Sequence, residues 1–273
     1  MDYGKLIEDS FTYAKEGLLG NIWTWILLIV LAIIPAIPVI IVIAAIVVGM
    51  IGGVPNWILL FSGMAVAIFL ALLLSSFLAG YEIRILRGTT PLPPVSGFGA
   101  MFFDGIRYIA IQIIYMIPVI IVVALTAGAA IMTALSSPTN PEAILPLIGG
   151  IILGIIIALI LAFIIGLFAI IGVVRFARTG RIGEAFNFSE ILATIRKIGW
   201  GHYILALIIV FVIVMVVEFV VGIIPVIGGI INLIIVPWVV VFMSRYISLL
   251  YDSAGAGEPT QPMAPVAAMA PAE

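Results

Sequence analysis

The chain has 273 residues, of which 65% are hydrophobic and only 9% are charged, whereas about a quarter of the residues in an ordinary soluble domain are charged. A mean hydropathy of +1.42 leaves too few polar side chains to cover the surface of a soluble globule. The composition therefore excludes a water-soluble protein and indicates an integral membrane protein.

Side chains that commonly bind metals or catalyse reactions are scarce. The chain contains no cysteine and one histidine, which excludes disulfides, thiolate or multi-histidine metal sites and cysteine nucleophiles. The net charge of −2 argues against nucleic acid as a partner. The sequence has no motif typical of zinc proteases, serine hydrolases or P-loop nucleotide-binding proteins. We therefore expect no metal, no cofactor and no enzymatic activity.

Six apolar stretches are long enough to cross a bilayer, because a hydrocarbon core of about 30 Å needs about 20 helical residues. They are Ile22–Val48, Trp57–Gly80, Ile106–Met132, Ile144–Val174, Tyr203–Val221 and Ile223–Ile247. We expect an all-α protein with six transmembrane helices in a single domain, residues 1–252. Residues 253–273 are rich in Pro, Ala, Gly and Met without apolar periodicity, which predicts a disordered cytoplasmic tail.

The basic residues are distributed asymmetrically among the connections. All 11 Lys and Arg residues lie before the first span, between the second and third, between the fourth and fifth, or at the end of the sixth. Basic residues concentrate in cytoplasmic loops. The distribution therefore predicts a multi-pass protein of the cell membrane with both termini in the cytoplasm.

A similar pattern occurs three times, at about residues 1–88, 94–181 and 184–252. Each unit starts with apolar residues at helical spacing, opposed by polar ones, which is typical of an amphipathic helix in the membrane interface. The apolar residues are Tyr3, Leu6, Ile7, Phe11, Ala14 and Leu18 in the first unit, Phe98, Met101, Phe102 and Ile106 in the second, and Phe188, Ile191, Leu192, Ile195 and Ile198 in the third.

Each of these segments is followed by a pair of spans. An aromatic residue, Trp25, Tyr108 or Tyr203, opens the first span of each pair, and Pro35 and Pro118 follow ten residues later in the first two units. We predict three parallel hairpin repeats, each preceded by a cytoplasmic interfacial amphipathic helix. The alternative is that aromatic residues at the interface are common to any protein with six spans.

The second span of each unit ends near an arginine. These residues are Arg84, Arg175 and Arg245, and Arg87 and Arg178 follow one turn later in the first two units. Arginines at helix C-termini complement the helix dipole and can bind phosphate with two hydrogen bonds. We predict that these five residues bind anionic lipid headgroups. The alternative is that they only set the topology.

Two second spans also carry small residues at intervals of four. They are Gly63, Ala67, Ala71, Ser75 and Ala79 in the second span of the protein, and Gly150, Gly154, Ala158, Ala162 and Gly166 in the fourth. Small residues at this spacing allow close approach of a neighbouring helix. We expect both sets to be helix-packing faces, with these helices in the inner layer of the bundle.

Few polar side chains fall within the predicted spans. Glu218 is expected near the outer interface, where its carboxyl group can reach water; a cation or proton site is the alternative. Gln112 and Asn232 are expected to form hydrogen bonds between helices.

Two carboxylates lie close to arginines in the connection between the second and third spans. Glu82 precedes Arg84 by two residues, and Asp104 precedes Arg107 by three. We expect each carboxylate to neutralise its neighbouring arginine.

The same connection carries a specific set of residues. They are Gly80-Tyr81, Arg84, Leu92-Pro93, Phe102-Phe103-Asp104-Gly105 and Tyr115-Met116-Ile117-Pro118. This pattern resembles a family of archaeal membrane proteins, common in methanogens, that is known only as a domain of unknown function (DUF4013). The resemblance extends over most of the chain up to Asp252 and implies an archaeal plasma-membrane protein without a known activity.

These observations leave two functional hypotheses. The first is a non-enzymatic protein that organises membrane lipid or a protein partner at the cytoplasmic face. The alternative is a transporter or channel for a small or lipid-like solute. A path for hydrophilic solutes needs polar residues on successive turns, and Gln112, Thr126, Glu218 and Asn232 are too sparse to provide one. A lipid-like solute needs fewer polar groups.

Overall fold

The computed structural model describes residues 1–51, 57–136, 144–224 and 227–256, and these residues form helices without any β-strand. Six helical segments are long and apolar enough to cross a membrane, as predicted. They are Ile22–Ile51, Leu60–Leu86, Phe98–Ala130, Leu147–Thr179, Trp200–Gly222 and Ile227–Gly255. Most of the predicted disordered tail lies outside the described residues, and its first residues form a helical turn that ends at Ala256.

The first third of the chain contains four helices. They are α1 (Tyr3–Leu19), α2 (Ile22–Ile33), α3 (Ala36–Ile51) and α4 (Trp57–Leu86). The carboxylate of Asp2 caps α1 by accepting a hydrogen bond from the backbone N–H of Lys5 at 3.0 Å. The first span is divided between α2 and α3 next to Pro35, because proline has no N–H to continue the helical hydrogen bonds.

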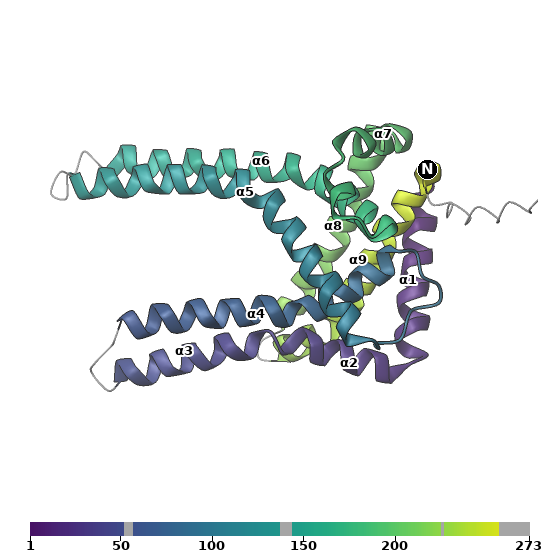
Figure 1. The fold of residues 1–273 in the computed structure, drawn as a ribbon, viewed down its shortest axis with the longest axis horizontal. Coiled ribbons are helices and arrows are strands. Elements are labelled where there is room, and N and C mark those ends of the chain that lie inside the picture. The colour runs from purple at the N-terminus through teal and green to yellow at the C-terminus, as the bar shows by residue number, and fades with distance from the viewer. Residues whose placement is uncertain (52–56, 137–143, 225–226, 257–273) are drawn as a thin grey trace, which may run out of the picture.

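The rest of the described chain contains five α-helices and two short helical turns. They are α5 (Phe98–Ser136), α6 (Ile144–Thr179), η2 (Ile182–Phe186), α7 (Phe188–Ile198), α8 (Trp200–Gly222), α9 (Ile227–Tyr251) and η3 (Asp252–Ala256). The second unit therefore has no separate helix before its first span, because α5 runs without a break from Phe98 through Pro118. Figure 1 shows that α5 bends along its length.

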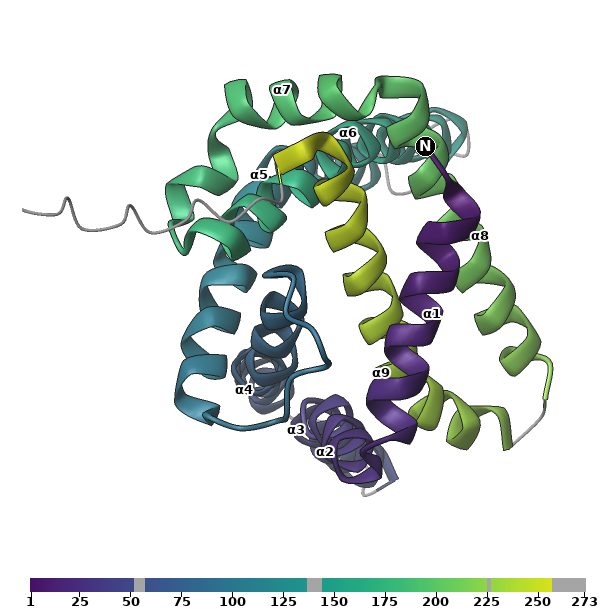
Figure 2. The ribbon, with the colours of Figure 1, turned by 90° about the vertical axis from the view of Figure 1, so that its right-hand side faces the viewer.

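Helices α1 and α7, together with the connection between α4 and α5, gather at one end of the molecule, here named the α1 end (Figures 1 and 2). The α3–α4 and α5–α6 hairpins project away from this end in roughly the same direction and stand apart from each other (Figure 1). Helices α8 and α9 run obliquely from the level of α7 to that of α2 (Figure 1). Contacts of α1 and α2 with α9 bring the first and last parts of the chain together, and the indole N–H of Trp25 donates a hydrogen bond to the carbonyl oxygen of Ile234 at 3.0 Å.

Helices α4 and α5 cross with their backbones in close approach. A Cβ atom added to Gly80 of α4 would overlap the carbonyl group of Met101, and one added to Gly105 of α5 would overlap that of Ser76. Both overlaps involve backbone atoms, which a side-chain rotation cannot move. Glycine at these two positions therefore sets the geometry of the crossing.

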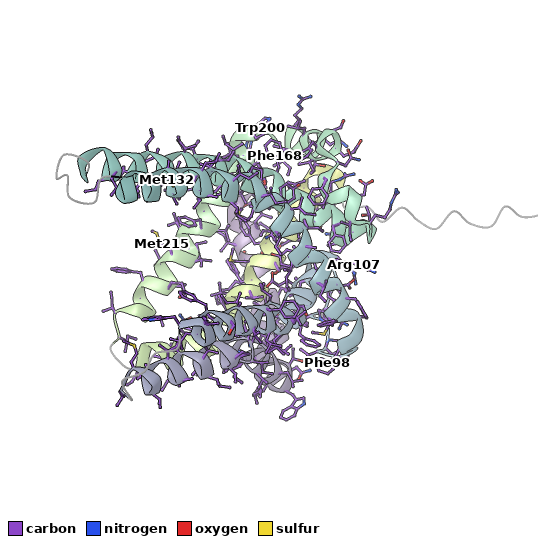
Figure 3. All side chains as sticks on the ribbon, turned by 60° about the vertical axis from the view of Figure 1, so that its left-hand side comes forward. Phe98, Arg107, Met132, Phe168, Trp200 and Met215 are labelled. Atoms are coloured by element: carbon purple, nitrogen blue, oxygen red, sulfur yellow. The ribbon has the colours of Figure 1, made fainter. Side chains whose placement is uncertain are left out.

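The projecting hairpins expose large apolar side chains. Ile51 and Ile58 are each 83% exposed, and exposed side chains also include Met132 of α5 and Met215 of α8 (Figure 3). A surface of this kind is unstable in water but fits contact with the hydrocarbon chains of a membrane. The chain therefore has the character of a multi-pass membrane protein.

Candidate functional site

A cavity of about 360 Å³ lies between α4, α5, α6 and α9. Its lining includes residues from all four helices. They are Glu82, Leu86, Tyr108, Gln112, Met116, Gly166, Ala169, Ile170, Val173, Val240, Met243, Ser244 and Ile247. The volume lies in the lower part of the usual range for small-molecule sites, about 300–1,000 Å³. This space is named the central cavity below.

The polar and apolar parts of the central cavity are separated along the helices. Glu82, Tyr108 and Ser244 belong to the half nearer the α1 end: Glu82 lies in the last turns of α4, and Tyr108 and Ser244 lie about two to three turns from the ends of α5 and α9 on that side. Met116 and Gly166 lie farther from the α1 end, where the lining is apolar. The cavity is thus amphipathic: its polar half, nearer the α1 end, holds the polar groups among apolar Leu86, Val173 and Ile247, and its other half is apolar.

The carboxyl group of Glu82 does not pair with Arg84, contrary to the expectation from the sequence. Arg84 instead donates a hydrogen bond from Nη2 to the carbonyl oxygen of Gly97 at 3.2 Å, while Glu82 lines the central cavity. Within the described part of the chain, no basic side chain forms an ion pair with Glu82. No group of three His, Asp or Glu residues that could hold a metal ion occurs there either.

Tyr108 and Gln112 form a local pair in the polar half of the central cavity. The amide Nε2 of Gln112 donates to the hydroxyl oxygen of Tyr108 at 3.3 Å. The expectation of an interhelical bond from Gln112 is therefore wrong, because the partner lies one turn away on α5. This direction leaves the hydroxyl hydrogen of Tyr108 available to another acceptor.

Three residues at corresponding positions of the predicted units line the central cavity together. Glu82, Val173 and Met243 each precede the arginine of their second span by two residues, and all three belong to the lining. Sequence analysis did not single out this cavity. The sequence signal that could have indicated it is the carboxyl group of Glu82, at a position that is apolar in the other two units.

Two arginines cross-link helix ends next to the central cavity on the α1 side. Arg87 forms an ion pair with Asp104 at 2.7 Å and donates from Nε to the carbonyl oxygen of Ala177 at 3.2 Å. Arg178 donates to Ser248 Oγ at 2.9 Å and to Asp252 at 2.7 Å. Each cross-link thus joins the second span of one predicted unit to a segment of the next unit.

The expected pairing of Asp104 with Arg107 is present, but it is the longer of two ion pairs. The Oδ1 atom of Asp104 lies 3.6 Å from Nη1 of Arg107, whereas Arg87 lies within 2.7 Å of the other carboxylate oxygen. Asp104 therefore neutralises Arg87, which directly follows α4, in addition to its neighbour on α5.

Arg175 and Arg245 also contact groups within the protein. Arg175 forms ion pairs with Glu184 and Glu190, and its hydrogen bond to Glu184 lowers the pKa of that carboxyl group. The guanidinium carbon of Arg245 lies 4.8 Å from the ring centre of Tyr13. Burial raises the pKa of Tyr13 to about 12, although the charge of Arg245 opposes the increase.

Glu218 and Asn232 are joined across the α8–α9 hairpin, far along the chain from the central cavity. The amide Nδ2 of Asn232 donates to a carboxylate oxygen of Glu218 at 3.0 Å. The predicted interhelical hydrogen bond of Asn232 is therefore present. It gives Glu218 a structural partner.

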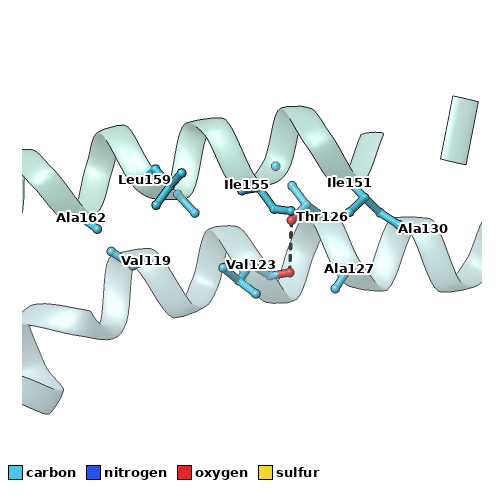
Figure 4. Close-up of a pocket in the computed structure, with 11 residues that line it drawn as sticks. Val119, Val123, Thr126, Ala127, Ala130, Ile151, Ile155, Leu159 and Ala162 are labelled. Carbon is cyan, nitrogen blue, oxygen red and sulfur yellow. Dashed lines mark hydrogen bonds between the residues drawn. The ribbon is translucent and has the colours of Figure 1, made fainter. Parts of the chain in front are cut away.

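Several of the small residues at intervals of four face neighbouring helices. Ala67 and Ala158 are buried, and a Cβ atom on Gly154 would come within 2.6 Å of Thr126 on α5. Figure 4 shows the groove of about 460 Å³ between α5 and α6 that is bordered by Gly154, Ala158 and Ala162. Thr126 bonds to backbone carbonyls of its own helix, so the groove offers almost only apolar surface.

The small residues do not all have this role. A Cβ atom on Gly150 or Gly166 would have nothing within 4 Å, and Gly166 borders the central cavity. Of the remaining positions, a Cβ atom added to Gly63 would lie 3.9 Å from the side chain of Val42 on α3. Ala71 and Ser75 are partly buried and Ala79 is buried.

A family model described as "Protein of unknown function (DUF4013)" matches residues 63–226, which is more than half of the chain. The chain belongs to this family. The matched part of the DUF4013 protein includes Glu82, Tyr108, Gln112 and Val173 of the central cavity, and it ends before α9. Comparison with curated proteins and with solved structures finds no match. The family description names no activity, so the function has to be argued from the site.

Proposed function

We propose that this DUF4013 protein is a non-enzymatic membrane protein that binds a lipid-like amphiphile in its central cavity. The amphipathic lining carries the proposal, because an amphiphile has a polar group and an apolar chain that match its two halves. A volume of about 360 Å³ suits a headgroup and the first part of a chain. A lipid held there, near the α1 end, is the form of lipid organisation at the cytoplasmic face that the geometry supports best.

The absence of enzymatic activity is part of this proposal. General acid and base catalysis commonly uses two titratable groups with matched geometry. In the described lining of the central cavity, Glu82 is accompanied by one other titratable side chain, the phenol of Tyr108, whose type ordinarily has a pKa of about 10. Binding without chemistry is the simpler function for such a lining.

The proposed architecture is three parallel hairpin repeats, at about residues 1–88, 94–181 and 184–252, in which α1 and α7 are the amphipathic interfacial helices of the first and third units and the first turns of α5 take that place in the second. Support comes from Glu82, Val173 and Met243, which share one cavity although they come from three units. The bonds from Arg87 to Ala177 and from Arg178 to Ser248 add support, since they connect corresponding helix ends in succession. We propose that residues 1–252 form one membrane domain.

We further propose that the α1 end faces the cytoplasm in a cell membrane, with both termini on that side. The distribution of all 11 basic residues supports this orientation. Reporters fused at Gly20 and Gly257 should both be cytoplasmic, and one at Thr139 should be external. A protein partner, if the protein has one, would then bind at the surface formed by α1 and α7.

The five arginines near the ends of the second spans are a separate proposal for binding anionic headgroups. The Nε atoms of Arg175, Arg178 and Arg245 are buried and have no acceptor among the described residues, which favours an additional oxygen ligand. The charges of Arg175 and Arg178 are already partly balanced by the carboxylates of Glu184 and Asp252. A phosphate would therefore compete with internal ion pairs.

Transport of a lipid-like solute is the second candidate function. Exposed Met116 borders the apolar half of the central cavity, and the cross-links of Arg87 and Arg178 lie next to its polar half. Such an arrangement could release a bound amphiphile toward the lipid. A flux assay with purified protein in liposomes distinguishes transport from binding alone.

Retention of lipid by a cavity-filling variant tests the proposed function. Gly166→Leu adds a side chain where a Cβ meets nothing within 4 Å, at the border of the central cavity. Gly149→Leu is the matched control, because Gly149 lies on the same helix, is exposed and also has nothing within 4 Å. Native mass spectrometry should show less bound amphiphile for Gly166→Leu only. Equal retention by the parent and both variants would contradict binding in the central cavity.

A further inference from the structure

We infer that the central cavity selects an amphiphile whose polar group is a cationic ammonium group. This inference deepens the proposed function and rests on it. It starts from Glu82, which is the only Asp, Glu, His, Lys or Arg residue that borders the cavity in the described structure. The inference concerns the charge of the ligand, which an amphipathic lining alone does not determine.

The arginines nearest to Glu82 in the chain are already bound elsewhere. Arg84 bonds to the carbonyl oxygen of Gly97, and Arg87 bonds to Asp104 and Ala177. Neither forms an ion pair with Glu82. No basic side chain of the described protein therefore balances this carboxyl group when it is ionised.

Partial burial between apolar helices makes a partner for Glu82 important. An ionised carboxylate removed from water loses a large solvation free energy unless a cation and hydrogen-bond donors replace the water. Its neighbours Leu86, Val173 and Met243 provide neither. An ammonium group provides both a positive charge and N–H donors.

The other polar groups of the central cavity are compatible with the same ligand. Gln112 uses one amide N–H for Tyr108, and its carbonyl oxygen and the hydroxyl oxygen of Ser244 can accept hydrogen bonds. The ring of Tyr108 adds an aromatic face, which attracts cations. A phosphate or carboxylate headgroup would instead be repelled by Glu82.

Four probes with the full-length protein in detergent test the charge preference. Dodecylamine, dodecanol and dodecanoate share a twelve-carbon chain and differ in charge, while methylammonium has the cation without the chain. We expect dodecylamine to bind about tenfold more tightly than dodecanol, because dodecanol lacks the charged hydrogen bond to Glu82 and one such bond corresponds to about a tenfold change in affinity. Dodecanoate and methylammonium should bind more weakly still.

The outcomes separate this inference from the proposed function. Equal binding of dodecylamine and dodecanol, both lost in Gly166→Leu, would overturn the cation preference and leave amphiphile binding intact. Binding of methylammonium as tight as that of dodecylamine would indicate a simple cation site. Such a result would overturn the amphiphile proposal itself.

Substitution of the carboxyl group tests the residue that carries the inference. Glu82→Gln keeps the shape of the side chain and should abolish the preference, so that dodecylamine and dodecanol bind with about equal affinity. Glu218→Gln is the control, since it removes another carboxyl group from the spans but leaves the central cavity unchanged. An unchanged preference in Glu82→Gln would overturn the inference.

Relocation of the carboxyl group guards against a trivial loss of folding. Val173 borders the same cavity at the corresponding position of the next predicted unit. The double variant Glu82→Val with Val173→Glu should regain the preference for dodecylamine that Glu82→Val alone loses. A folded double variant without the preference would contradict selection by a carboxyl group in the cavity.

Discussion

Gly105 of α5 lies so close to Ser76 of α4 that a Cβ atom on the glycine would overlap the carbonyl group of the serine. The substitution Gly105→Ala should therefore separate the two helices. Overpacking typically costs about 1–3 kcal/mol, and backbone atoms cannot rotate away as side chains do. We expect a lower melting temperature of the detergent-solubilised protein.

Gly128→Ala provides the matched control on the same helix. A Cβ atom there meets nothing within 4 Å, and alanine favours helix over glycine by up to about 1 kcal/mol. This variant should melt at the same temperature as the parent or slightly higher. If Gly105→Ala were equally stable, the helix crossing would not depend on the close approach.

Removal of the charge of Asp104 should also destabilise the protein. Its carboxylate side chain is only 11% exposed and binds Arg87 at 2.7 Å. Asp104→Asn would leave Arg87 without its anionic partner, at a cost of roughly 1–3 kcal/mol. Glu190→Gln is the control, because Glu190 lies 3.7 Å from Arg175 with its side chain 57% exposed, and exposed pairs contribute about 0–1 kcal/mol. Equal melting temperatures of the two variants would contradict the importance of the Arg87–Asp104 pair.

The ion pair of Glu184 with Arg175 predicts a dependence of stability on pH. The hydrogen bond from Arg175 lowers the pKa of Glu184 in the folded protein below its ordinary value of 4.5. Folding is therefore favoured while the carboxyl group is ionised, and this contribution is lost as the pH falls below about 4.5 through the folded-state pKa. Unfolding measured across this range should depend less on pH in Glu184→Gln. Identical pH profiles would show that the pair contributes nothing.

Much of the helical framework could be predicted from the sequence, because the length of an apolar run is a local property; the break at Pro35 could not, since Pro118 at the corresponding position lies inside α5. The continuous helix α5 could not be predicted by analogy with the other units. Gly199 follows α7 with a positive φ of 89°, whereas Gly105 lies inside α5 and is accommodated there. A glycine ends a helix only where the surrounding structure favours another backbone conformation.

The candidate site was harder to predict than the spans. The position of Glu82 next to Arg84 suggested an ion pair, yet the two side chains diverge because Arg84 binds Gly97 and Glu82 lines the central cavity. Which face of α4 meets a cavity depends on how four helices pack, and no local pattern contains that information. The pair of Gln112 with Tyr108, in contrast, follows from their spacing of four on one helix.

The proposal for anionic headgroups predicts a difference between arginine and lysine. Exchange of Arg84, Arg87, Arg175 and Arg178 for lysine preserves the positive charge that sets topology but removes bidentate binding of phosphate. We expect unchanged orientation of reporters at Gly20 and Thr139 and reduced retention of anionic lipid in native mass spectra. Undiminished retention would leave topology and internal ion pairs as the roles of these arginines.

Photolabelling tests binding in the central cavity most directly. A twelve-carbon alkylamine with a diazirine in its chain would be bound to the full-length protein in detergent, activated by light and located by peptide mass spectrometry. Competition by unlabelled dodecylamine identifies specific labelling. The account predicts competed labels on the cavity segments of α5 and α9, which contain Met116 and Val240, and their loss in Gly166→Leu. Competed labels confined to the exposed surface of the α3–α4 hairpin would contradict it.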